Sequence, residues 1–392
     1  MSEPTFYFLL FLILISGKIL AELAERLGQT AVLGELCAGI VLGPSLFNCI
    51  PCHENVPGFY MVRDIARLGI CVLLFRIGLE TNFTKMAKVG LVSITTAVIG
   101  VMCPFLLAFV FCHLFKFTLI TTLFIGTTLA ATSVGLTSRI LSDLKKLDTK
   151  ESQIILGAAV IDDVIGLIVL SIVSGINVSG SISFVAIEKT ILFITGFFIL
   201  ALLLGGFVKP LFNLLDKAKT RVTIITISFC FLLIMAYYAN YVGMATISGA
   251  FLAGMLLTRT KQLESIDEKT KPLVEILTPI FFVVVGASVD LRVLNPFNPE
   301  NKDVLILSAF LIPIAIVGKF ASGFTIWEKG IRKDMVGVGM IPRGEVALVC
   351  AQVGLSSSVL TQKTFSALVV VIIVTALVTP PLLKFTIKKT IL

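Results

Sequence analysis

The sequence predicts an all-α polytopic membrane protein with about 13 transmembrane helices. Of its 392 residues, 57% are hydrophobic and only 14% are charged, whereas soluble domains carry about 25% charged residues. Runs without Lys, Arg, Asp or Glu, such as Val89–Phe115, Phe117–Ser138 and Thr364–Leu383, are each long enough to cross a hydrocarbon core about 30 Å thick. The composition therefore leaves no segment that resembles a soluble domain.

The predicted helices follow these uncharged runs in order. They cover residues 5–24, 31–50, 65–81, 90–115, 118–138, 153–175, 185–208, 222–239, 243–258, 272–289, 304–327, 335–353 and 365–383. The run Val222–Thr258 is divided into two passes because it is long enough for both, with a tight turn near Asn240–Gly243.

The net charge of +8 is explained by membrane topology and not by a nucleic-acid partner. With the N-terminus outside, the predicted cytoplasmic loops and tail hold 21 Lys and Arg, and the outside loops hold five. Basic residues concentrate in cytoplasmic loops, so this asymmetry predicts an outside N-terminus and a cytoplasmic C-terminus in a cell membrane. No exposed basic domain is present that could bind nucleic acid.

Two sequence motifs repeat at the same helix offset. Gly34–Leu42 resembles Gly249–Leu257, and Leu74–Glu80 in the next helix resembles Phe282–Ser288. The offset is seven helices, an odd number, so the second copy is inverted relative to the first. Inverted repeats are typical of alternating-access carriers.

The same offset pairs the two most irregular predicted helices, which contain Gly126–Gly135 and Gly337–Val346. Helices interrupted by Gly, Pro and polar residues at corresponding places in two halves indicate a carrier's substrate site. We expect five parts: a scaffold or dimer domain in 1–89 and 222–303, a core transport domain in 90–175 and 304–392, and a linker helix in 176–221.

Asp162 and Asp163 lie in the middle of the apolar segment Gln153–Ser171. A carboxylate at the centre of a membrane helix costs several kcal/mol, so an adjacent pair indicates a function. Neighbouring helix residues point about 100° apart, so one carboxylate can face a cavity while the other faces a neighbouring helix. The pair predicts a site for a cation and for protons, with Asp163 and Asp162 as oxygen ligands of Na⁺.

Lys319 is the one cation in the interior of its predicted helix. It either extends to the cytoplasmic face or pairs with an Asp; the face is about eight residues away, so we favour the pair. Thr132 and Ser133 could add hydroxyl or carbonyl ligands to the cation, or could form hydrogen bonds between helices.

Arg343 and Glu345 lie in or near the second irregular helix. They either neutralise each other and the dipoles of the half-helices or take a direct part in transport.

The motifs Ala131–Gly135, Gly157–Leu170, Val317–Lys319 and Pro342–Val346 resemble those of the NapA-type bacterial and archaeal sodium/proton antiporters of the monovalent cation:proton antiporter-2 family. The resemblance spans essentially the whole chain. It implies a 13-helix homodimer with a moving core, Asp163 as the ion-binding carboxylate, Asp162 as the partner of Lys319, and Thr132 beside the ion. Related potassium-efflux systems tend to replace the first aspartate with a neutral residue, so Asp162 favours Na⁺.

The predicted function is electrogenic Na⁺(Li⁺)/H⁺ antiport by alternating access, without a cofactor and without enzymatic chemistry. A K⁺/H⁺ antiporter or K⁺ efflux carrier is the alternative, because the ligand radius is not evident from the sequence. An intramembrane aspartyl protease is disfavoured, since it needs two aspartates on facing helices and adjacent ones point apart.

Overall fold

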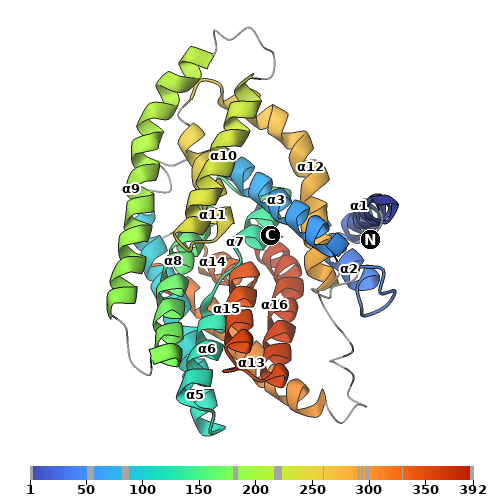
Figure 1. Ribbon diagram of the computed structural model, residues 1–392, viewed down its shortest axis with the longest axis vertical. Helices are drawn as coiled ribbons and strands as arrows, with labels where there is room; N and C mark the ends of the chain where they lie inside the picture. Colours follow the sequence, from blue (N-terminus) through green and yellow to red (C-terminus); the bar gives the residue numbers. More distant parts are fainter. Residues whose placement is uncertain are drawn as a thin grey trace.

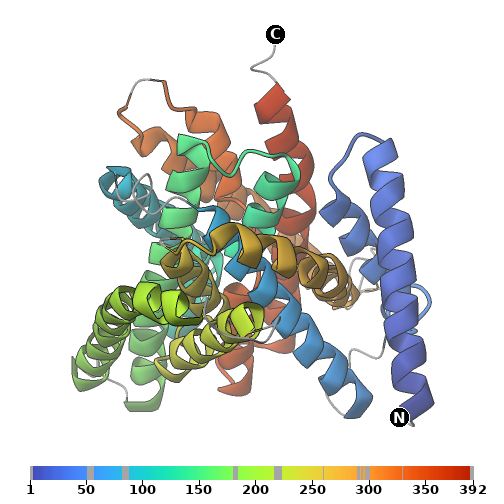
Figure 2. The same ribbon diagram turned by 90° about the horizontal axis from the view of Figure 1, so that it is seen from above.

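The computed structural model describes residues 3–50, 57–81, 88–179, 184–215, 223–258, 260–288, 292, 295, 301–328 and 330–388. Within these ranges the chain is helical and contains no β-strand. The helices are α1 (Glu3–Arg26), α2 (Ala31–Leu42), α3 (Pro57–Glu80), α5 (Gly90–Leu114), α6 (Leu119–Ala130), α7 (Val134–Asp143), α8 (Lys150–Ser179), α9 (Phe184–Leu215), α10 (Thr223–Tyr241), α11 (Thr246–Leu257), α12 (Leu263–Ala287), α13 (Lys302–Phe320) followed by a 3₁₀ turn (Ala321–Thr325), α14 (Lys333–Gly339), α15 (Glu345–Ser356) and α16 (Gln362–Lys388). Helices α9 and α1 lie at opposite edges of the molecule (Figures 1 and 2).

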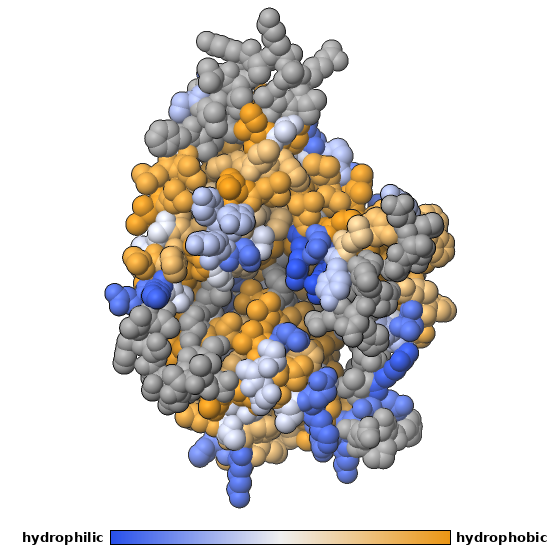
Figure 3. All heavy atoms as spheres, viewed as in Figure 1, coloured by the Kyte–Doolittle hydropathy of each residue, from blue (hydrophilic) through white to orange (hydrophobic). Residues whose placement is uncertain are grey.

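The predicted all-helical membrane architecture is confirmed. In the described part of the chain, eight helices are long and apolar enough to cross a membrane, and three shorter apolar helices accompany them. Apolar residues cover much of the surface seen in Figure 3, as expected for a surface that faces lipid. The exact number of thirteen spans stays a prediction.

Several helix ends differ from the predicted ones. Helix α2 ends at Leu42 and not at residue 50, whereas α3 begins at Pro57 instead of 65 and α12 begins at Leu263 instead of 272. The sequence Gly43-Pro44 follows α2, and proline disfavours a helical residue before it. Helices α3 and α12 extend into charged sequence, because charge limits an apolar span but does not end a helix.

Two helices are interrupted, as predicted, and their breaks touch. Residues 131–133 separate α6 from α7, and residues 340–344 separate α14 from α15. The backbone N–H of Ser133 donates to the carbonyl of Pro342 at 2.8 Å, and the Thr137 hydroxyl donates to the carbonyl of Gly339 at 2.8 Å. Backbone groups that a break leaves free inside a membrane need such partners.

The repeated sequence motifs make the same contact in both halves. A Cβ atom on Gly39 of α2 would lie 2.7 Å from Cα of Gly286 on α12. In the second copy, a Cβ on Gly254 of α11 would lie 2.9 Å from Cα of Gly78 on α3. Only glycine permits such close approach of two helices, and equivalent glycines provide it at both places.

The helices pack mainly in two groups. Helices α1, α2 and α3 pack with α10, α11 and α12, and we call them the scaffold group. Helices α5, α6 and α8 pack with α13, α14, α15 and α16; together with α7, which contacts members of both sets, they form the core group. The Lys384 amine at the end of α16 donates to the Gly28 carbonyl just after α1, so these two helix ends share one face of the molecule.

Candidate ion-transport site

Asp162 lies on α8 beside the crossing of the two interrupted helices. Its Oδ2 atom accepts a hydrogen bond from the Lys319 amine at 2.5 Å and one from the Thr132 hydroxyl at 2.6 Å. Asp162, Lys319 and Thr132 are all buried. Ion pairing and hydrogen bonding offset the cost of placing a charge in a low-dielectric interior.

The amine of Lys319 does not reach a membrane face in this structure, because its side chain has no exposed surface. The Lys319 amine can reach Asp162 because Gly100 on the neighbouring helix α5 has no side chain. A Cβ atom on Gly100 would lie 3.4 Å from the amine. Gly318 of α13 packs against Pro104 of α5, so small residues allow these two helices to lie close together.

Asp163 points away from Asp162 and towards the scaffold group. The Ser248 hydroxyl of α11 donates to Oδ2 of Asp163 at 2.5 Å, and both residues are buried. Asp163 also lines a cavity of about 320 Å³ that extends to Asn240 in the last turn of α10 and to Gly243 between α10 and α11. The two carboxylates therefore have different surroundings, as their one-residue spacing predicts.

The two adjacent carboxylates, Asp162 and Asp163, are suited to different roles. The charge of Asp162 is balanced by the Lys319 ammonium, whereas Asp163 lines the cavity beside the α10–α11 turn. A carboxylate in such a place can hold either a proton or a small cation with a preference for oxygen ligands.

Arg343 is buried and donates to backbone carbonyls. Its guanidinium bonds the carbonyls of Ile341 at 3.1 Å and Ala315 at 3.0 Å. Ile341 lies just past the C-terminal end of half-helix α14, where the helix dipole is negative and attracts a cation, whereas Ala315 lies within α13. The side chain of Glu345 lies outside the part of the chain that the structure describes.

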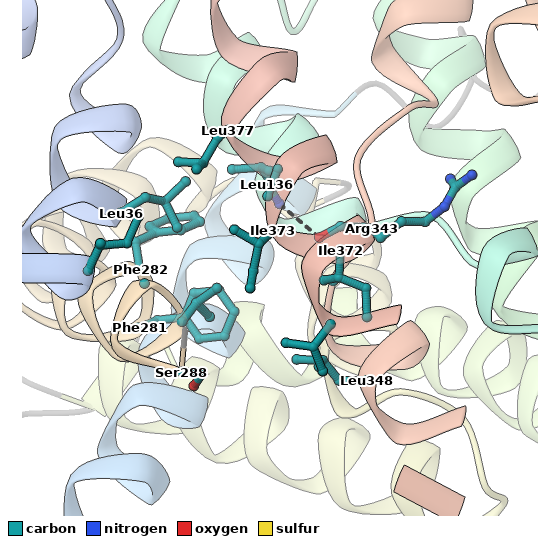
Figure 4. Close-up of a pocket in the computed structure, with 17 residues that line it drawn as sticks. Leu36, Leu136, Phe281, Phe282, Ser288, Arg343, Leu348, Ile372, Ile373 and Leu377 are labelled. Carbon is teal, nitrogen blue, oxygen red and sulfur yellow. Dashed lines mark hydrogen bonds between the residues drawn. The ribbon is translucent and has the colours of Figure 1, made fainter. Parts of the chain in front are cut away.

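Ser133 lies at the break, but its hydroxyl accepts a hydrogen bond from the Leu136 backbone N–H at 3.4 Å and so caps α7. Figure 4 shows this bond beside a second, apolar cavity of about 80 Å³. Leu36 and Phe282 lie on one side of that cavity and Ile372 on the other, while the guanidinium of Arg343 extends away from it (Figure 4).

Ser248 is a site residue that was not predicted from the sequence. It directly precedes the repeated motif Gly249–Leu257, and it is one of two polar residues, with Thr246, in the apolar helix α11. Those two features could have marked it, but only the packing of α11 near α8 shows that it meets Asp163.

Comparison with known proteins shows the same architecture throughout the chain. The model of the transmembrane sodium/hydrogen exchanger family matches residues 10–389. The high-affinity Na⁺/H⁺ antiporter NhaS3 of Synechocystis sp. is 37% identical over 96% of this chain and 88% of that protein. The Na⁺/H⁺-K⁺ antiporter GerN of Bacillus cereus is 31% identical over 98% of this chain and 97% of that protein.

The solved structure of the sodium proton antiporter MjNhaP1 from Methanocaldococcus jannaschii at pH 8 has the same fold. It matches with a TM-score of 0.71 at 15% identity, over 99% of this chain and 98% of that chain. The family model covers nearly every residue, and the interrupted helices cross beside a buried carboxylate pair. The chain therefore belongs to the transmembrane sodium/hydrogen exchanger family.

Proposed function

We propose that this protein exchanges Na⁺ or Li⁺ for protons across the cell membrane. The observation that carries the proposal is the divergence of two adjacent buried carboxylates: Asp162 forms an ion pair with Lys319, and Asp163 lies on a cavity. The relatives named as Na⁺/H⁺ antiporters support the same function. We expect no cofactor and no enzymatic reaction.

The exchange follows from competition for the same oxygen atoms. Na⁺ requires an ionised carboxylate, so its binding to Asp163 expels the proton from that group. A second proton leaves the Asp162–Lys319 pair when that ion pair re-forms. Two protons then move against one Na⁺, and each net charge moved couples to about 2.3 kcal/mol per 100 mV of membrane potential.

Alternating access requires the site to face one side at a time. We propose that the core group, 90–175 and 304–392, moves against the scaffold group, 1–89 and 222–303, with 176–221 as the linker. The repeated glycine contacts within the scaffold group support a rigid frame. With the N-terminus outside, the α10–α11 turn is external, so the cavity connects Asp163 to the outside.

A homodimer is the proposed assembly, since exposed apolar side chains such as Phe8, Phe11 and Ile15 of α1 provide a surface for lipid or for a second copy.

The second candidate function is K⁺/H⁺ exchange. It is favoured by one observation, that some relatives, such as GerN and the K⁺/H⁺ antiporter 1 of Saccharomyces cerevisiae, have K⁺ in their names.

Purified protein in proteoliposomes tests the proposal. A pH gradient is imposed, and Na⁺, Li⁺ and K⁺ are titrated separately while internal pH is followed. We expect Na⁺ and Li⁺ to dissipate the gradient, K⁺ to have little effect, and an imposed voltage to change the rate. Dissipation by K⁺ alone would favour the second candidate, and a rate insensitive to voltage would contradict the exchange of two protons for one Na⁺.

A further inference from the structure

The hydrogen bond between Ser248 and Asp163 joins the two groups of helices at the transport carboxylate. Ser248 belongs to α11 of the scaffold group, and Asp163 belongs to α8 of the core group. The two oxygen atoms are 2.5 Å apart and both residues are about 2% exposed. The Thr132 contact to Asp162, by contrast, lies within the core group.

The first turn of α11 lies beside the same carboxylate. Ser248 is the third residue of this helix, and Ala245, Thr246 and Ile247 line the cavity together with Asp163. Ala245 at the N-cap provides no side-chain hydrogen bond to the helix. The N-terminal end of a helix carries partial positive charge, which attracts an ionised carboxylate and repels a cation.

We propose that Ser248 is a positioning residue that anchors the ionised Asp163 carboxylate to the scaffold group, and that Na⁺ must displace this hydrogen bond to bind. The inference rests on the proposed antiport. The donor hydroxyl and the positive end of α11 both stabilise the bare carboxylate, and neither stabilises the carboxylate once a cation neutralises it. Loading therefore releases the core group from the scaffold.

The anchor gives the carrier a physical means of coupling. In an antiporter, the core group must not change the side that it faces while Asp163 carries neither a cation nor a proton. Such a change would uncouple the flux of the cation from the opposing flux of protons. A hydrogen bond to an ionised group is about twice as strong as one between neutral groups. It thus holds the core group most firmly when Asp163 is unloaded.

The test uses Ser248→Ala and the matched control Ser228→Ala in full-length protein. Ser228 is a fully buried serine on α10 of the same scaffold group, and its hydroxyl bonds the Ile224 carbonyl of its own helix at 2.8 Å. Na⁺-dependent exchange is measured in proteoliposomes, and Na⁺-dependent thermal stabilisation is measured in detergent. Ser248→Thr keeps the donor hydroxyl and serves as the rescue variant.

For Ser248→Ala, we expect KM for Na⁺ to fall by about tenfold or more, the scale of one hydrogen bond to a charged group, while the maximal rate is not reduced. The Na⁺ concentration that gives half-maximal thermal stabilisation should fall in parallel. Ser248→Thr and Ser228→Ala should retain the wild-type values. If Ser248→Ala does not fold, Ser248→Cys should show a smaller decrease in KM, because a thiol is a weak donor.

A rise in KM for Ser248→Ala would overturn the proposal, because it would make the hydroxyl a ligand of the cation. An unchanged KM would overturn it as well. If the wild-type protein showed neither exchange nor stabilisation with any of the three cations, the proposed function itself would fail together with this inference.

Discussion

The Nζ atom of Lys319 lies 2.5 Å from Oδ2 of Asp162, and neither side chain has exposed surface. Taking two such charges out of water is costly, and only their mutual attraction and hydrogen bonds offset the cost. The remaining oxygen, Oδ1 of Asp162, is buried and has no hydrogen-bond partner among the residues that the structure describes. The pair is therefore sensitive to the loss of either member.

Removing the Lys319 amine should destabilise the protein. Breaking a buried ion pair typically costs about 3–5 kcal/mol, because the other charge remains unpaired. We expect Lys319→Ala to lower the melting temperature at high pH and to weaken or abolish voltage-driven exchange. Lys363→Ala is the matched control, since Lys363 pairs with Asp303 at 2.6 Å but both side chains are exposed.

Asp162→Asn added to Lys319→Ala should restore part of the lost stability, since it removes the unpaired charge. A melting curve of Lys319→Ala equal to that of the wild type at high pH would show that the pair contributes nothing to the fold.

Replacing Asp163 with asparagine should abolish exchange while the protein still folds. Asparagine has nearly the same shape as aspartate but cannot release a proton or provide a negative charge to a cation. The measurement is Na⁺-dependent proton flux in proteoliposomes, together with the melting temperature in detergent. Asp303→Asn, at an exposed site, is the control, and wild-type flux in Asp163→Asn would remove Asp163 from the site.

Alanine at Gly254 should disrupt the contact between α11 and α3. A Cβ atom there would lie 2.0 Å from the Phe75 carbonyl oxygen, so a backbone would have to move. Overpacking of this kind costs typically about 1–3 kcal/mol. Gly196→Ala on α9 is the control, because a Cβ there meets no atom of the described residues within 4 Å and alanine favours the helix. Equal melting temperatures for the two variants would contradict the close packing.

Thr132 and Ser133 should respond differently to alanine. The Thr132 hydroxyl bonds Asp162, whereas the Ser133 hydroxyl caps α7. Ser133→Ala should lose about 1 kcal/mol of stability, as expected for a helix cap, with little change in KM for Na⁺. Thr132→Ala should change KM more strongly. A larger change in KM for Ser133→Ala would instead support a direct contact between Ser133 and the ion.

Much of the fold follows from local properties of the sequence. Each predicted helix coincides with an observed helix or with an interrupted pair, because uncharged runs must form hydrogen-bonded helices inside a membrane. The breaks near Thr132 and Pro342 were also predictable, since proline and clusters of small polar residues do not continue a helix. The helix ends of α3 and α12 were wrong because the boundary of an apolar run is not the boundary of a helix.

The sequence by itself determined that adjacent carboxylates in a membrane helix point to different surroundings, because helical geometry alone requires it. Only the tertiary structure decided what those surroundings are. The Asp162–Lys319 bond joins residues 157 positions apart, and the Asp163–Ser248 bond joins residues 85 positions apart. Such partners depend on how α8, α11 and α13 are placed relative to one another, and that placement is decided by interhelical contacts that no local pattern contains.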